Sequence, residues 1–293
     1  MKDAARLLAY LGATVLFGAV AAPILFWAAQ WLAVHGIFPK LATFDFEAYF
    51  HRALLLGALL FLWPFLRSLQ IRSPRDLGLV PNRAWIRDVA IGFLISALPT
   101  LCCGILLVAF GNYTMRSEVA WGAVGSVVLT AAVVPFIEEG FFRGLIQGII
   151  LRDNRPLTAT LLSAGVFAII HFLKAPEETT TSVTWASGFL SLAHSFDQFA
   201  EPMLVLAGCT TLFLIGVILA HARLRTRSLW LPIGLHVGWI FASSEFNKVA
   251  HRELVVLPWL GKNLLVGIVP LFVCFVSWIL LGVFLKYGVA RKS

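Results

Sequence analysis

The sequence predicts an all-α protein that crosses a membrane several times, and two observations carry this prediction. Of the 293 residues, 59% belong to the apolar set AVILMFWYC and only 13% are charged, which is well below the roughly 25% of charged residues in soluble domains. Several runs of about 20 apolar residues are each long enough to cross a hydrocarbon core of about 30 Å. The composition excludes a disordered chain and a disulfide scaffold, and it leaves too few charged residues to cover the surface of a soluble protein.

Eight apolar segments follow one another along the chain, and we interpret 1–293 as a single membrane domain. The first segment is too long for the apolar region of a signal peptide, so we expect it to remain as an uncleaved span. The fifth segment is short, whereas the fourth is long enough to tilt or to protrude. The predicted spans are 6–34, 49–71, 85–110, 119–150, 157–174, 200–222, 228–249 and 264–287.

The positive residues predict the orientation of these spans. With the N-terminus inside, the inner segments hold 15 of the 23 Lys and Arg residues and the outer segments hold 7, while Arg143 falls within a span. This excess on one side predicts that both termini are cytoplasmic. Orientation and anionic lipid therefore explain the net charge of +8, and we expect a lipid bilayer rather than a nucleic acid as the partner of these residues.

Three charged residues, Glu138, Glu139 and Arg143, interrupt the fourth span. A charge at mid-membrane costs about 2.5–3.5 kcal/mol on insertion scales, so this cluster requires a physical reason. Glu139 and Arg143 are four residues apart, share one helix face and can form a buried pair. Glu138 points about 100° away from Glu139 around the helix, and this pairing leaves it without a partner.

The neighbouring spans supply partners at the same depth. The residues 153–156 (Asp-Asn-Arg-Pro) predict a tight turn between spans four and five. Glu138 and His171 are equally far from its midpoint, so an antiparallel hairpin places them level, and Phe167 lies one helical turn before His171. His236, in the seventh span, enters the membrane by about 12 Å at 1.5 Å per residue. This arrangement predicts a polar, water-containing cavity in which a carboxylate activates water and a histidine donates to an oxyanion.

At these residues the sequence resembles the CPBP membrane proteases. They are also called the Abi or CAAX-protease-and-bacteriocin-processing family, and they include the Rce1-like CAAX prenyl endopeptidases. The resemblance covers about 120–240 and also touches a family feature before the third span. All predicted site residues lie within 119–249. The matching motifs are EExxxR at Glu138–Arg143, FxxxH at Phe167–His171, SLW at Ser228–Trp230 before His236, and DLGL at Asp76–Leu79.

The resemblance implies an endopeptidase that hydrolyses a peptide bond of a membrane-associated protein or peptide, lipidated or not, in CAAX-type, C-terminal or leader processing. It implies that Glu138 is the general base, that His171 orients the water and that His236 faces the oxyanion. Glu139 and Arg143 would hold the site in place. We expect no cofactor, and the alternative is a zinc ion held by Glu138, His171 and His236 with one open position. The expected location is the bacterial inner membrane.

One residue departs from the family's pattern, because Ile240 stands where the family has Asn, four residues after the last histidine. This departure allows three interpretations. The site works without this Asn, or Ser243, Ser244 or Asn247 replaces it, or the protein is a non-catalytic immunity or chaperone-like member of the family.

A proton-coupled transporter is the remaining alternative, since it too would carry intramembrane Glu, Arg and His. The clustering of the charges and the lack of a visible inverted repeat in the sequence argue against a transporter.

Overall fold

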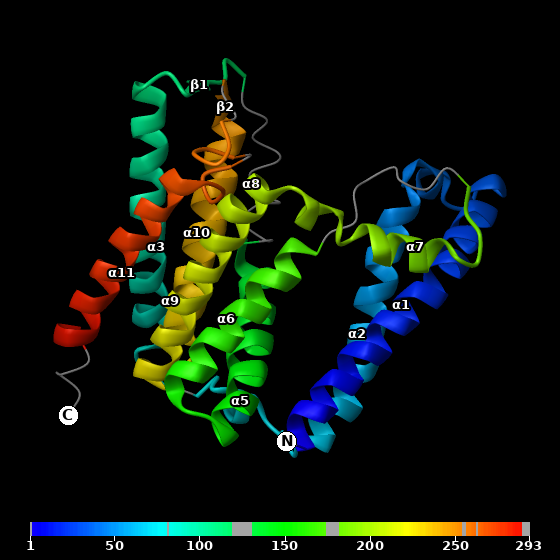
Figure 1. Ribbon diagram of the computed structural model, residues 1–293, viewed down its shortest axis with the longest axis horizontal. Helices are drawn as coiled ribbons and strands as arrows, with labels where there is room; N and C mark the ends of the chain where they lie inside the picture. Colours follow the sequence, from blue (N-terminus) through cyan, green and yellow to red (C-terminus); the bar gives the residue numbers. More distant parts are fainter. Residues whose placement is uncertain are drawn as a thin grey trace. The chain divides into compact units, whose positions relative to one another are not determined.

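The computed structural model describes residues 2–80, 82–118, 131–173, 182–253, 256–261 and 263–288, and helices make up most of them (Figure 1). The chain divides into two compact units. The first unit comprises Met1–Arg72 and Leu173–Glu201, and the second comprises Ser73–Phe172 and Pro202–Ser293. The interpretation of 1–293 as one membrane domain stays a prediction.

The first unit is built on two long helices that pack side by side, α1 (Lys2–Val34) and α2 (Phe46–Ser68) (Figure 1). The connection between them contains the 3-10 helix η1 (Pro39–Thr43). Asp45 ends this connection, because its carboxylate accepts a hydrogen bond of 2.9 Å from the backbone N–H of Ala48 and so caps α2. Alanines 19, 22 and 53 pack here with two phenylalanine rings, so small and large side chains interlock between the helices.

A short helix, α7 (Ser187–His194), lies on α1 within the first unit. The contact is close because Gly188 has no side chain, and a Cβ atom there would meet the backbone oxygen of Ala19. The 3-10 helix η4 (Asp197–Ala200) follows. Residues 187–199 fall between the fifth and the sixth predicted spans, and the structure forms helices in this region.

The second unit contains the three motifs and positions the site. Residues 131–139 are helical and lead directly into the π-helix η3 and α5. The elements of this unit are η2 (Pro74–Leu77), α3 (Trp85–Ala109), β1 (Tyr113–Met115), η3 (Gly140–Ile146), α5 (Gln147–Asp153), α6 (Pro156–Phe172), α8 (Pro202–Leu204), η5 (Val205–Cys209), α9 (Thr210–Thr226), α10 (Trp230–Val249), β2 (Ala250–Arg252) and α11 (Ile268–Gly288).

Glycines bring the helices of the second unit into close contact. On α10, a Cβ atom at Gly234 would meet the backbone oxygen of Val89 on α3. On α9, a Cβ atom at Gly216 would lie 2.9 Å from Cα of Ala164 on α6. Beyond the ends of α3 and α10, β1 and β2 pair antiparallel, with Tyr113 opposite Arg252. Small residues at these crossings let backbones approach as they do in membrane helix bundles.

Five helical segments of the described residues are long and apolar enough to cross a membrane, namely α1, α2, α3, Pro202–Thr226 and α11. The chain is therefore an integral membrane protein. The fifth predicted span corresponds to α6, which has only 17 residues, and the fourth begins in 119–130, outside the described residues. The predicted number of eight spans stays a prediction.

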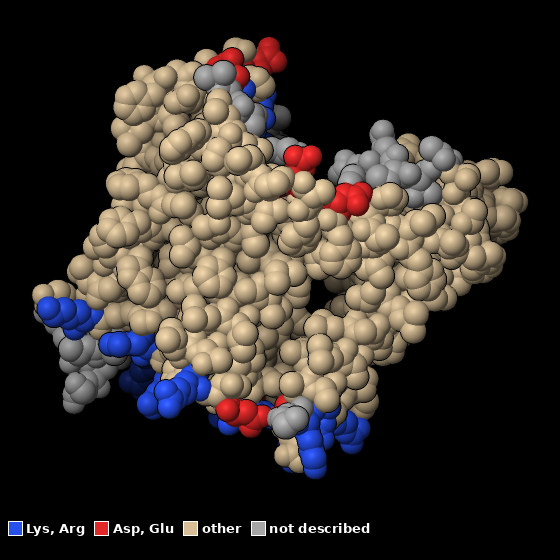
Figure 2. Space-filling model, viewed as in Figure 1, with Lys and Arg blue, Asp and Glu red and all other residues tan. Residues whose placement is uncertain are grey.

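Charged side chains gather at the ends of the helices rather than along their sides (Figure 2). On the face shown, Lys and Arg cluster at the end of the second unit where α11 finishes, and Asp and Glu are seen near the end that carries β1 and β2. This distribution agrees with the sequence argument for one basic side. That this side is cytoplasmic stays a prediction.

Candidate active site

The EExxxR motif lies where the helix of residues 131–139 changes into the π-helix η3. Glu138 and Glu139 end the first part, and Arg143 lies within η3. Short π-helical stretches often mark functional sites. Glu139 and Arg143 are 0% and 1% exposed, so both charges are removed from any solvent and require partners.

Glu139 and Arg143 form the buried ion pair that their spacing predicted. Nη1 of Arg143 donates to Oε1 of Glu139 at 2.9 Å. Nη2 of the same guanidinium donates to the backbone oxygen of Gly216 on α9 at 3.4 Å. The ring of Phe167 lies over the guanidinium, with 4.3 Å between Cζ and the ring centroid. The pair is therefore held by an ion pair, a backbone carbonyl and an aromatic face at once.

Glu138 contacts His171, as the hairpin argument predicted. The distance from Nε2 of His171 to Oε2 of Glu138 is 3.2 Å. The side chains of Glu138 and His171 remain 24% and 27% exposed, in contrast to the enclosed Glu139–Arg143 pair. The turn lies where the sequence placed it, because α5 ends at Asp153 and α6 begins at Pro156.

His236 faces the same space from α10 and contacts both glutamates. Its Nδ1 lies 2.8 Å from Oε1 of Glu139, and its Nε2 lies 3.6 Å from Oε2 of Glu138. Its side chain is 7% exposed. The three helices therefore converge on one polar cluster, which confirms the predicted meeting of Glu138, His171 and His236. Whether this cluster is catalytic stays a prediction.

The bond from His236 to Glu139 was not expected from the sequence, which paired Glu139 with Arg143 alone. Spacing within one helix or one hairpin places residues level, but it does not orient α10 toward them.

A second residue that the sequence argument missed is Gln147, one helical turn after Arg143. It is fully buried, and its Nε2 donates to the backbone oxygen of Ala220 at 3.1 Å. The repeat of polar residues at 139, 143 and 147 is the signal that could have revealed it.

The hydrogen bonds assign the ring nitrogens of both histidines. Nδ1 of His171 lies 2.9 Å from the backbone oxygen of Phe167, and Nδ1 of His236 faces Glu139. Carbonyl and carboxylate oxygens accept hydrogen bonds, so each Nδ1 carries a hydrogen, and each Nε2 of a neutral ring is an acceptor. Both Nε2 atoms face Oε2 of Glu138, which is also an acceptor when it is ionised. A hydrogen bond between Nε2 of His171 and Oε2 of Glu138 therefore requires a proton on one of these two atoms.

Ile240 lies one turn beyond His236, where the family has Asn. Among the described residues, no hydrogen bond connects Ser243, Ser244 or Asn247 to the site. The hydroxyl of Ser243 instead donates to the backbone oxygen of Ile240 within its own helix, at 3.3 Å. The replacement of the family's Asn by one of these side chains stays a prediction.

The side chains that the zinc alternative requires are Glu138, His171 and His236. Within the parts of the chain that the structure describes, no group of three or more His, Cys, Asp or Glu side chains is arranged to hold a metal ion. The alternative ligand set of Glu138, His171 and His236 therefore gains no support from this geometry, and we derive no catalytic step through zinc.

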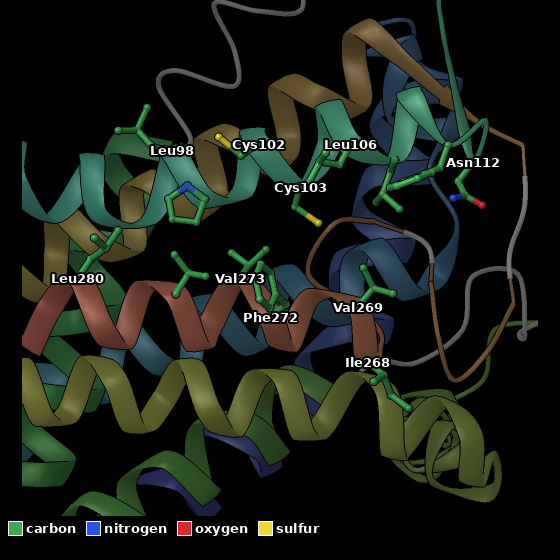
Figure 3. A pocket seen from close by; sticks show the side chains of 14 residues that line it. Leu98, Cys102, Cys103, Leu106, Asn112, Ile268, Val269, Phe272, Val273 and Leu280 are labelled. Atoms are coloured by element: carbon green, nitrogen blue, oxygen red, sulfur yellow. The ribbon is translucent and has the colours of Figure 1, made fainter.

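A cavity of about 700 Å³ lies between α3 and α11, away from the site (Figure 3). Its walls are apolar, with Cys103, Phe272 and Val273 between the two helices and Asn112 at one end. None of the residues around Glu138 lines it. The cavity is therefore separate from the proposed chemistry.

Comparison with known protein families agrees with the motifs. Residues 120–242 match the family model described as type II CAAX prenyl endopeptidase Rce1-like. The match contains the EExxxR and FxxxH motifs, His236 and Ile240. No curated protein and no solved structure matches the chain.

Proposed function

We propose that this chain, whose residues 120–242 form an Rce1-like domain, is an intramembrane endopeptidase that uses Glu138 to activate water. The observation that carries the proposal is the convergence of Glu138, His171 and His236 inside a helical membrane protein, with a second glutamate and an arginine buried behind them. The family supports a protease in general terms, and the glutamate mechanism is our proposal.

The reaction begins with the partly exposed carboxylate. Glu138 takes a proton from a water molecule, and the resulting hydroxide adds to the carbonyl carbon of the scissile peptide. His171 orients this water from the neighbouring helix. In its protonated form, with a hydrogen on both ring nitrogens, His236 then donates from Nε2 to the oxyanion of the tetrahedral intermediate. When the intermediate collapses, the C–N bond breaks and Glu138 returns its proton to the leaving amine.

Glu139 and Arg143 support this chemistry without contacting the water. Oε1 of Glu139 binds both Nδ1 of His236 and Nη1 of Arg143, so it fixes the ring orientation and the tautomer of His236. A carboxylate that orients a histidine in this way resembles the aspartate of a catalytic triad in its role. Arg143 in turn fixes Glu139.

The substrate that we propose is a membrane-associated protein or peptide, with a prenylated C-terminal segment as the first class to test. The bilayer is the second partner, and we expect no nucleic acid. We further propose that the protein resides in the bacterial inner membrane with both termini in the cytoplasm. Metal-dependent hydrolysis, a non-catalytic immunity or chaperone role and proton-coupled transport remain the alternatives.

The test measures cleavage of two fluorogenic peptides, one with a prenylated C-terminal cysteine motif and one without the prenyl group, by the purified protein in detergent. Glu138→Gln keeps the size of the side chain but cannot take a proton from water. We expect kcat to fall by at least about 10²-fold, the low end for loss of a general base. Glu253→Gln is the control, because Glu253 is exposed beyond β2, and it should cleave like the wild type.

Three outcomes would contradict the proposal. Wild-type turnover by a correctly folded Glu138→Gln variant would remove Glu138 from the role of base. Absence of cleavage by the wild type, together with full biological activity of the same variant, would favour the non-catalytic alternative. Proton-coupled flux in liposomes would favour the transporter.

A further inference from the structure

We propose that Gln147 is a positioning residue that fixes the active-site helix against α9, an inference that rests on the proposed protease function. Gln147 begins α5 and lies two turns after Glu139. It is fully buried, and it lies outside the EExxxR motif. Its amide nitrogen donates to the backbone oxygen of Ala220 on α9 at 3.1 Å.

The contact belongs to a regular ladder between the two helical segments. Arg143 donates to the backbone oxygen of Gly216, and Gln147 donates to that of Ala220. The two donors are four residues apart, and so are the two acceptors. Two such bonds along the same pair of helices set both the axial offset and the rotation of one helix against the other. A single bond at Arg143 would still allow one helix to rotate against the other about that contact.

Of the two attachments, Arg143 lies at the middle of the π-helix η3, whose residues are Gly140–Ile146, and Gln147 directly follows its end. Residues 139, 143 and 147 follow one another at steps of four, which keeps them on one side of a helical segment, and they are 0%, 1% and 0% exposed. The π-helix η3 lies between Glu139 and Gln147. Arg143 and His236 hold Glu139 at one end of η3, and Gln147 holds the other end.

Fold stability alone gives a weak reason for an amide at this position. Oε1 of Gln147 is buried without a hydrogen-bond partner among the described residues, which is unfavourable in an apolar interior. Ala220 lies inside α9, where its carbonyl is already placed for the helical hydrogen bond. An apolar side chain of the same length would therefore serve packing at least as well. The hydrogen bond of the amide instead holds Arg143 in place. Through Arg143 it also holds Glu139 and His236.

The experiment compares Gln147→Met with the wild type in detergent. Methionine keeps the length and lacks the donor. We expect kcat to fall by about 10- to 100-fold, the range that a displacement of up to about 1 Å produces, with KM unchanged because the substrate contacts remain. The melting temperature should stay within about two degrees of that of the wild type, the shift that a small change in stability produces in a chain of this size. Hydrogen–deuterium exchange over 140–153 should be faster.

Ser277→Ala is the matched control. Ser277 is also fully buried, and its hydroxyl donates to a backbone oxygen of another helix, that of Ile95 on α3, at 3.1 Å. We expect this variant to keep both kcat and exchange over 140–153. Unchanged kcat and unchanged exchange in Gln147→Met would overturn the proposal. A melting temperature that falls with kcat, with faster exchange in all helices, would show that Gln147 is only structural and would also overturn it.

Failure of the proposed function gives a different result. If the wild type cleaves neither peptide, the protease proposal fails, whereas exchange over 140–153 still tests Gln147. Faster exchange confined to that segment would support its positioning of the Glu139–Arg143 pair, and equal exchange would reject it.

Discussion

Removal of Arg143 should destabilise the protein strongly, because it leaves the carboxylate of Glu139 buried without its guanidinium partner. Glu139 is 0% exposed, and in Arg143→Ala only His236 remains bonded to its Oε1. Breaking a buried ion pair by removing one partner costs about 3–5 kcal/mol. The contact of the guanidinium with the ring of Phe167 adds about 0.5–2 kcal/mol. We therefore expect a loss of about 4–6 kcal/mol in the free energy of unfolding, with the two ranges not strictly additive.

The assay is thermal or denaturant unfolding in detergent. Arg6→Ala is the control, because Arg6 forms an ion pair of 2.9 Å with Asp3 in which the two side chains are 46% and 21% exposed. Exposed pairs contribute about 0–1 kcal/mol, so this variant should unfold almost like the wild type. The double variant Glu139→Gln/Arg143→Ala should recover part of the loss, because it leaves no charge behind. If Arg143→Ala unfolds like the wild type, the pair does not stabilise the fold and the reasoning is wrong.

Three further results are expected. Gly78→Ala should lower the free energy of unfolding by about 1–2 kcal/mol, because Gly78 has φ +93°, which L-residues adopt at that cost. Its new Cβ would also lie 2.6 Å from the guanidinium of Arg223. Gly148→Ala is the control, since no atom lies near its Cβ, and it should unfold at the same temperature as the wild type or at a higher one. Gly234→Ala should lower both stability and kcat, because its Cβ would meet the backbone of Val89 and push α10 away from α3; a normal melting temperature would contradict this. Peptide cleavage should persist after dialysis against EDTA, and loss of cleavage that zinc restores would favour the metal-dependent alternative.

Much of the site could be predicted because it depends on local geometry. A helix places residues four positions apart on one face, so Glu139 and Arg143 had to be neighbours. A tight turn makes residues at equal distances level, so Glu138 and His171 had to share a depth. The bilayer strengthens both arguments, since charged side chains inside it need partners. The ends of α1, α2 and α3 lie within a few residues of the predicted ends, because runs of apolar residues mark them.

The tertiary structure alone determined how α10 and α9 meet the site. His236 bonds Glu139, and Gln147 bonds Ala220, across sequence separations of 97 and 73 residues. Such contacts depend on which faces pack together, and in the membrane the apolar faces of a helix are nearly equivalent in hydrophobicity, so hydropathy does not select among them. The choice is made by small residues such as Gly234 and Gly216, whose missing side chains admit a neighbouring backbone. The sequence by itself determined that the chain is a helical membrane protein with a level Glu138–His171 pair. The packing of α9 and α10 joined this pair to His236 and to the buried Glu139–Arg143 pair, because close helix contact depends on shape in three dimensions.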